Sequence, residues 1–143
     1  MYKDIAKDFL LITQEIYKIK EDQMQIEIRG EQAILLCLKG FPNKDLTPGD
    51  LSRKLNLKTA RVAAILNQLE SKEFVIRKQD KIDKRRTFIN LTDEGIKEAI
   101  NIETNHLNKI SNLFEKFGKD DSLLTIDLLN KLLKILKKKN EDD

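Results

Sequence analysis

The segment from residue 47 to residue 72 restricts the fold of this chain most tightly, because it encodes two helices joined by an abrupt break. Thr47 offers a hydroxyl N-cap, Pro48 occupies the first helical position, and Asp50 places a carboxylate three residues after the cap. This helix continues through DLSRKL and ends at the following NL after barely two turns. A second helix is predicted from about residue 58 to 72. The spacing predicts a helix-turn-helix.

The second of these helices has two chemically different faces. Its apolar residues recur at i, i+3, i+4 and i+7: Val62, Ile65, Leu66 and Leu69. Its opposite face is small or polar: Ala60, Ala64, Asn67 and Ser71, flanked by Arg61 and Gln68. Small and polar side chains let the backbone of the helix approach a flat or grooved partner.

Two strand-like segments follow at residues 74–77 and 87–91, and a strongly charged turn separates them. The nine positions 78–86 contain seven charged residues, and five of these are basic. A solvated turn would account for any single lysine, but it does not explain why so many cations lie one hairpin beyond a helix-turn-helix. Such cations repel one another and are stabilised by phosphate. The order of elements therefore predicts a winged helix-turn-helix that binds DNA through a major-groove helix and a projecting hairpin.

Charge is distributed unevenly along the chain. Residues 44–91 contain 12 Lys and Arg against 6 Asp and Glu, whereas the rest of the chain contains 15 basic and 18 acidic residues. The formal net charge of +3 hides this difference. A basic centre in a nearly neutral frame is typical of a nucleic-acid-binding module.

Length and composition favour one folded domain without disulfides. The chain has 143 residues, of which 40% are hydrophobic and 36% charged. Cys37 is the single cysteine and lies among leucines, so we expect a buried thiol in a reducing compartment. Charges at Asp4, Lys7 and Asp8 exclude an uncharged signal-peptide core, and no apolar run approaches the roughly 18 residues of a membrane span. We expect a cytoplasmic protein.

Further helices are predicted on both sides of the basic centre. One covers about residues 3–20, with the apolar stripe Ile5, Phe9, Ile12, Ile16 and Ile19. A short one runs from near Gly30 to Gly40. Another follows the cap Thr92-Asp93-Glu94 and ends at Gly118, with the stripe Ile96, Ile100, Leu107, Ile110, Phe114 and Phe117.

The last predicted helix, about residues 122–138, is apolar on nearly all sides. An exposed helix of this kind must be covered, and in a small chain the cover expected is a second copy of the same chain. Residues 137–143 are interpreted as a charged tail without regular structure.

These segments resemble the MarR-type transcriptional regulators, and the resemblance covers most of the chain. RGEQAILLCL resembles the second helix of that family, and LTPGDLSRKLNLKTARVAAILNQLESKEFVIR resembles its helix-turn-helix. IDKRRTFINLTDEG resembles its wing, in which an Asp-x-Arg element precedes a strand ending in Leu-Thr, with a glycine shortly after. Asp83-Lys84-Arg85 and the segment 91–95 match that pattern in type and spacing.

The resemblance implies a mainly α-helical fold with a small β-hairpin wing, that is, a winged helix-turn-helix with N- and C-terminal dimerisation helices. We expect one domain over residues 1–143, with a DNA-binding lobe at about 44–91 and a helical dimerisation region at about 1–28 and 92–138. Family members form homodimers and typically repress transcription at palindromic operators. The residues expected at the dimer interface are Ile5, Phe9, Ile12, Leu128, Leu129, Leu132 and Leu136.

The resemblance also assigns roles in DNA binding to the wing. Arg85 is expected to enter the minor groove, with Asp83 orienting it through a charge-assisted hydrogen bond. Lys84 and Arg86 are expected to contact phosphates. In the recognition helix, the residues expected to contact backbone or bases are Lys58, Thr59, Arg61, Asn67 and Gln68.

Two positions depart from the family pattern. Ala63 and Ala64 stand where the family often has polar residues, which removes hydrogen-bonding base contacts but leaves methyl groups that can touch thymine. Sequence preference would then depend more on the wing and on DNA shape. Glu73 stands where the family usually has the glycine that ends the recognition helix, so a different helix end is expected here.

Other function classes fit the residues less well. His106 has Glu103 three residues before it but no further ligand at metal-binding spacing, and no glycine-rich phosphate loop or nucleophile–base pair is visible. We therefore expect no enzyme, metal or cofactor. A winged helix that binds only protein remains an alternative, although such a wing has no need of Asp83 and Arg85 together.

A small aromatic effector is a further hypothesis, because many family members release DNA on binding one. Tyr17, Phe9 and Phe41 are the candidate contacts, although each also suits a place in the core. Other members respond to cysteine oxidation, but Cys37 lies outside the region where the family's peroxide sensors keep their reactive cysteine. No redox control is expected.

Overall fold

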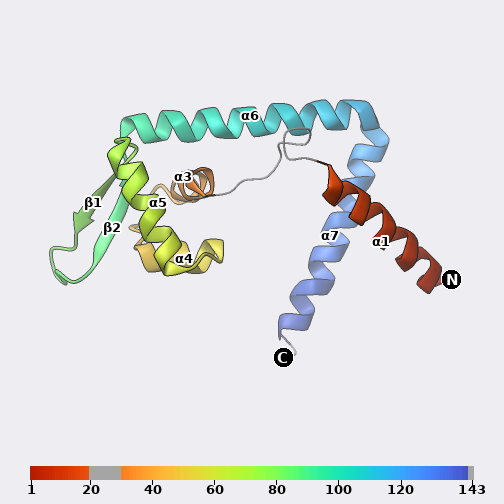
Figure 1. Ribbon diagram of the computed structural model, residues 1–143, viewed down its shortest axis with the longest axis horizontal. Coiled ribbons are helices and arrows are strands. Elements are labelled where there is room, and N and C mark those ends of the chain that lie inside the picture. The colour runs from red at the N-terminus through yellow and green to blue at the C-terminus, as the bar shows by residue number, and fades with distance from the viewer. Residues whose placement is uncertain (20–29, 142–143) are drawn as a thin grey trace. The chain divides into compact units, whose positions relative to one another are not determined.

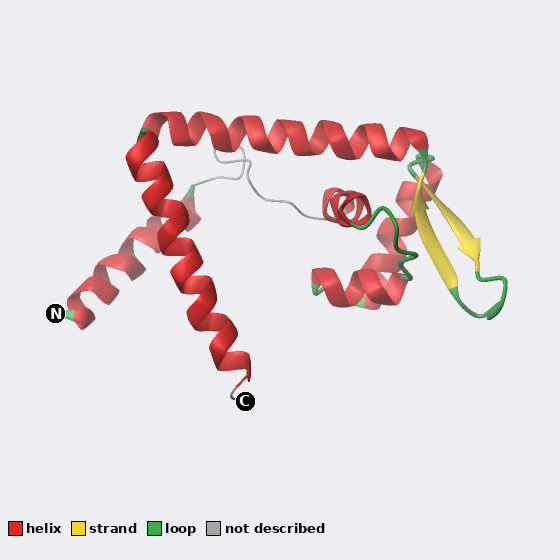
Figure 2. Cartoon of the chain, turned by 180° about the vertical axis from the view of Figure 1, so that it is seen from behind, coloured by secondary structure: helices red, strands yellow, loops and turns green. Residues whose placement is uncertain are grey.

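The computed structural model describes residues 1–19 and 30–141, and it is mostly helical with one antiparallel hairpin (Figures 1 and 2). Its elements are α1 (Tyr2–Lys18), α3 (Glu31–Gly40), α4 (Pro48–Leu55), α5 (Thr59–Ser71), β1 (Val75–Gln79), β2 (Thr87–Leu91), α6 (Asp93–Phe117) and α7 (Lys119–Glu141). The chain divides within α6 into two compact units, Met1–His106 and Leu107–Asp143. The predicted fold class, a mainly helical protein with a winged helix-turn-helix, is confirmed. Residues 20–28 of the predicted dimerisation region lie outside the described residues.

The core lies within the first unit and joins α3, α4, α5, the hairpin and the start of α6. Its buried members are Ile34, Leu35, Leu38, Leu46, Leu51, Val62, Ile65, Leu66, Leu69, Val75, Ile89, Ala99 and Ile102. All four residues predicted to form the apolar face of the recognition helix are in this set. Among the described residues, no helix has both the length and the apolar content needed to cross a membrane.

The start of α4 has the predicted capping box. The backbone N–H of Asp50 donates to Thr47 Oγ1 at 3.1 Å, and the backbone N–H of Thr47 donates to Asp50 Oδ2 at 2.9 Å. This backbone hydrogen bond holds the pKa of Asp50 below its ordinary value of 3.8. Asn56 then takes a left-handed conformation, with φ 51°, and ends α4 at the predicted break.

The recognition helix, α5, ends in a left-handed residue even though that residue is a glutamate. Glu73 has φ 61°, its N–H donates to the carbonyl of Glu70 at 3.0 Å, and the N–H of Phe74 donates to the carbonyl of Leu69 at 2.9 Å. This pair of hydrogen bonds is the Schellman arrangement that glycine normally permits. The expectation of a different helix end at Glu73 was therefore wrong.

A backbone junction joins the end of α5, the base of the hairpin and the start of α6. Thr92 donates from its N–H to the carbonyl of Phe74 at 3.0 Å and from its hydroxyl to the carbonyl of Glu73 at 2.6 Å. The same hydroxyl accepts from the N–H of Gly95 at 3.0 Å and so caps α6, as predicted. A Cβ on Gly95 would lie 1.9 Å from the Phe74 carbonyl oxygen, so this close approach requires glycine.

Two predicted boundaries were wrong. β1 begins and ends later than the predicted strand at 74–77. In α6 the buried residues are Gly95, Ala99 and Ile102, and members of the predicted apolar stripe such as Ile96 and Ile100 are exposed in the single chain. Residues 137–141 belong to α7 because lysine is a good helix former and suits the negative end of the helix dipole.

Replacement of Glu73 by glycine should raise the free energy of unfolding by about 1 kcal/mol, because the left-handed conformation strains any residue with a Cβ.

Gly95→Ala should lower the free energy of unfolding by about 2 kcal/mol or more, because the new Cβ collides with backbone. Gly40→Ala is the matched control, since a Cβ there meets nothing within 4 Å. Urea denaturation measures all three. A Glu73→Gly protein no more stable than the parent would contradict the strain at this position.

Candidate nucleic-acid interface

The outward face of α5 presents the predicted contact residues to solvent. Lys58 is the N-cap, and its extended backbone places it where the chain enters the helix. The five recognition-helix candidates are all exposed: Lys58, Thr59, Arg61, Asn67 and Gln68. Ala63 and Ala64 are exposed beside them, so this face combines methyl groups with amide and cationic side chains. Their contacts with DNA stay a prediction.

The hairpin tip is organised by hydrogen bonds of its own. The N–H of Asp80 donates to the Arg86 carbonyl at 2.9 Å, and the N–H of Arg86 donates to the Asp83 carbonyl at 3.0 Å. The side-chain amide of Gln79 donates to the Lys84 carbonyl at 2.6 Å. These bonds close the turn between β1 and β2, where Gln79 pairs with Thr87. The crowded cations are therefore attached to an ordered backbone.

Asp83 accepts two hydrogen bonds from Arg85. Its Oδ1 accepts from the Arg85 backbone N–H at 3.1 Å and from Arg85 Nε at 3.3 Å. The Arg85 side chain is 92% exposed, whereas that of Asp83 is 41% exposed. One carboxylate oxygen thus binds the backbone N–H and the inner guanidinium nitrogen of Arg85, and the rest of the guanidinium is open to solvent.

Arg77 on β1 is a charged residue of this surface that the sequence interpretation missed. Its Nη2 donates to Asn67 Oδ1 on α5 at 2.7 Å, and its Nε lies 3.4 Å from a carboxylate oxygen of Glu70. The sequence offers one signal, since Asn67 and Glu70 are three apart on a helix and share a face. Arg77 lies 10 residues after Asn67 in the sequence, so helical spacing does not reveal the contact.

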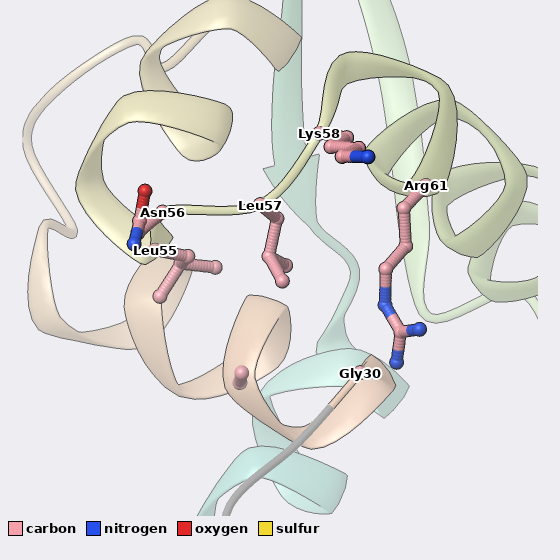
Figure 3. Close-up of a pocket in the computed structure, with 7 residues that line it drawn as sticks. Gly30, Leu55, Asn56, Leu57, Lys58 and Arg61 are labelled. Atoms are coloured by element: carbon pink, nitrogen blue, oxygen red, sulfur yellow. The ribbon is translucent and has the colours of Figure 1, made fainter.

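A cleft lies beside the N-terminal end of the recognition helix (Figure 3). It has a volume of about 520 Å³ and is lined by Gly30, Ala33, Leu55, Asn56, Leu57, Lys58 and Arg61. The Arg61 side chain extends toward Gly30 across one side of it (Figure 3). The predicted effector residues are elsewhere: Phe9 and Tyr17 are exposed on α1, and Phe41 packs partly against the core, with Lys54 Nζ 4.1 Å from its ring centroid.

The residues expected to form a dimer interface are exposed in the single chain. Their exposed fractions lie between 51% and 65%: Ile5, Phe9, Ile12, Leu128, Leu129, Leu132 and Leu136. They belong to α1 in the first unit and α7 in the second. Large apolar residues at such exposure leave both helices in need of a covering surface.

His106 and Cys37, the candidates for metal-binding and redox chemistry, make contacts typical of structural residues. His106 Nε2 lies 3.1 Å from Gln32 Oε1, which ties α6 to α3. Burial raises the pKa of the Cys37 thiol above its ordinary value of 9.0, which disfavours the reactive thiolate. In the part of the chain that the structure describes, no cluster of three or more His, Cys, Asp or Glu could hold a metal ion.

Comparisons with known proteins converge on one group of regulators. The family model described as MarR matches residues 29–87. The chain is 28% identical over 107 residues to the HTH-type transcriptional repressor YetL of Bacillus subtilis, a match that covers 75% of this chain and 64% of YetL. It is also similar to YdgJ of the same organism, an HTH-type transcriptional regulator, with 28% identity over 62% of this chain and 54% of that protein.

Among solved structures, the chain is similar to MepR of Staphylococcus aureus, a transcription regulator of a multidrug efflux pump. The crystal structure of MepR has 26% identity and a TM-score of 0.67, over 92% of this chain and 97% of MepR. MepR has also been solved with DNA, where identity is 25% and the TM-score 0.63 over 90% of this chain and 96% of that one. A third structure contains ethidium bromide, with 28% identity and a TM-score of 0.52 over 92% and 95% of the two chains. YetL, YdgJ and MepR are transcription regulators, in agreement with the prediction that the chain is no enzyme.

Proposed function

We propose that the chain, whose residues 29–87 match the MarR family model, is a sequence-specific DNA-binding repressor of transcription. It binds palindromic operator DNA as a homodimer, with α5 in the major groove and the hairpin reaching the minor groove. One observation carries the proposal. At the tip of an ordered basic hairpin, the Asp83 carboxylate accepts a hydrogen bond from the exposed Arg85 guanidinium. The MepR–DNA complex supports it, because that protein shares this fold over nearly its full length.

In the wing, Arg85 and the cations beside it have different roles in DNA binding. Arg85 extends from an ordered turn, so little conformational freedom is lost when its guanidinium enters a narrow, electronegative groove. Lys84 and Arg86 are exposed on either side and neutralise phosphates. Arg86 also lies over the Phe88 ring, with 5.5 Å between the guanidinium carbon and the ring centroid, which limits its motion.

The recognition helix contributes through both charge and shape. Lys58 and Arg61 stand at its N-terminal end, where backbone N–H groups also favour phosphate. Asn67 and Gln68 lie further along the exposed face and supply amide groups to base edges. Ala63 and Ala64 allow close approach and can contact thymine methyl groups. A protein-only interaction module would use neither the ordered arginine nor its flanking cations.

Arg85→Ala should weaken operator binding by about 1–3 kcal/mol and relax preference at the wing-contacted positions. Lys84→Ala should weaken all sequences alike and reduce the slope of log affinity against log salt by about one unit. Fluorescence anisotropy across a salt series measures both quantities, and Lys116→Ala on α6 serves as the control cation. If Arg85→Ala binds like the parent, the role proposed for the wing is wrong.

A second copy of the chain is the proposed cover for α1 and α7. The apolar residues of α7 face all directions around the helix and are between 45% and 61% exposed: Leu123, Leu124, Ile126, Leu128, Leu129, Leu132, Leu133, Ile135 and Leu136. Symmetric dimers bury such surfaces against themselves, and two copies would place two recognition helices on the two halves of a palindrome.

A charge at Leu129 or Leu132 should release monomer, because an unpaired charge cannot be buried in an apolar interface. Sedimentation of Leu129→Glu and Leu132→Glu measures this. Lys131→Glu introduces the same charge at a polar position of the same helix and should sediment as the parent does. An unchanged sedimentation coefficient for both leucine variants would exclude α7 from the interface.

The cleft beside α5 is the proposed site for a small aromatic effector. MepR has been solved with ethidium bromide, so a relative of this fold holds a planar aromatic ligand. In this chain Ala33, Leu55 and Leu57 line the cleft together with Lys58 and Arg61. A ligand bound there would withdraw those two cations from DNA.

Salicylate and 4-hydroxybenzoate should raise the melting temperature of the parent protein, because a ligand that binds the folded state stabilises it. Ala33→Met, which fills the cleft, should remove that shift. A thermal-shift series measures both effects. No stabilisation of the parent by either acid would count against an effector of this class, and an equal shift in Ala33→Met would place the ligand elsewhere.

A further inference from the structure

Arg77 connects the wing to the recognition helix. It lies two residues after the buried Val75, so both side chains leave β1 on the same face, and the contacts of Arg77 show that this face lies against α5. Val75 fills the core at the base of this face. Arg77 continues it and reaches two α5 side chains, with 2.7 Å from its Nη2 to Asn67 Oδ1 and 3.4 Å from its Nε to Glu70.

The positive charge of Arg77 is largely engaged in contacts within the protein. Glu70 is the one acidic residue in the sequence of α5, and it would repel DNA phosphates if it were unpaired. Arg77 neutralises it, and the two side chains are 37% and 48% exposed. An arginine engaged with both Glu70 and Asn67 is not free to extend toward the DNA backbone as Lys84 or Arg85 can.

The hydrogen bond also settles the orientation of the Asn67 amide. A guanidinium has only donors, so the atom of Asn67 that faces Arg77 must be the oxygen. The amide NH₂ is then the group left to meet a base edge. In the major groove, asparagine recognises adenine by using its oxygen and its nitrogen together, so engagement of the oxygen removes that two-point contact. The NH₂ alone finds two neighbouring acceptors on guanine, O6 and N7, and one on thymine, O4, whereas adenine offers only N7 beside its own N6 donor.

We propose that Arg77 is a positioning residue that directs the Asn67 amide NH₂ toward base acceptors, so that α5 prefers guanine or thymine over adenine at the base contacted by Asn67. The inference rests on the proposed DNA binding and adds a specificity to it. Because Arg77 is part of β1, its side chain also links the position of Asn67 to the position of the wing.

Selection from a randomised duplex pool, followed by sequencing, tests this on the full-length protein. The parent should select guanine or thymine at one position in each half-site, and Asn67→Ala should lose that preference. Arg77→Met should also lose it, or shift it to adenine, because the Asn67 oxygen becomes free. Discrimination at that position should fall by roughly 5- to 150-fold, the range of one specific base contact.

Conservative variants separate positioning from simple stabilisation. Arg77→Lys keeps a donor for Asn67 Oδ1 and should retain much of the preference. Glu70→Gln removes the ion pair but keeps the hydrogen bond, so it should change affinity without changing the selected base. Adding Arg77→Met to Asn67→Ala should cause no further loss of preference, because the two residues act through one contact.

Several results would overturn the inference. One is an Asn67-dependent preference for adenine in the parent. Another is an Arg77→Met protein that weakens all sequences alike with the base preference intact, as a purely structural residue or a phosphate contact would. An unchanged preference in Asn67→Ala would also exclude it. If the parent binds no duplex at all, the proposed function fails first, which distinguishes the two claims.

Discussion

The carbonyl groups of Glu73 and Phe74 form the junction on which the rest of the winged helix-turn-helix depends. Thr92 binds both of them and also caps α6, while the missing side chain of Gly95 lets α6 approach within contact of the backbone. A left-handed Glu73 is needed to present these carbonyls. The recognition helix, the hairpin and the start of α6 therefore meet at one hydrogen-bonded junction.

Short-range hydrogen bonds also order the tip of the hairpin. Five basic residues lie within nine positions, and their mutual repulsion would favour a mobile turn. Asp83 and the backbone bonds of Asp80 and Arg86 oppose this by closing the turn and by binding the backbone and Nε of Arg85. Arg77 adds a restraint between the hairpin and α5. An anion that met this surface would find its cations already placed, which reduces the entropy lost on binding.

The features that could be predicted from the sequence depend on neighbours within four residues. The caps at Thr47 and Thr92 and the buried face of α5 are of this kind, because a hydroxyl or an apolar period acts locally. The bond from Arg77 to Asn67 joins a strand to a helix, and the cleft at Lys58 joins three segments, so neither follows from local spacing. The left-handed Glu73 was missed because the Schellman bonds and Thr92 together offset the strain of its side chain.

Equilibrium binding of the parent protein to labelled duplex DNA, measured by fluorescence anisotropy over a salt series, shows whether the chain binds DNA through its basic surface. The logarithm of the affinity should fall linearly with the logarithm of the salt concentration, with a slope set by the several cations of the wing and α5. Binding to the DNA upstream of the chain's own gene should be tighter than binding to random duplex. Salt-independent binding, or no binding to either DNA at low salt, would contradict a DNA-binding role and favour a winged helix that binds only protein.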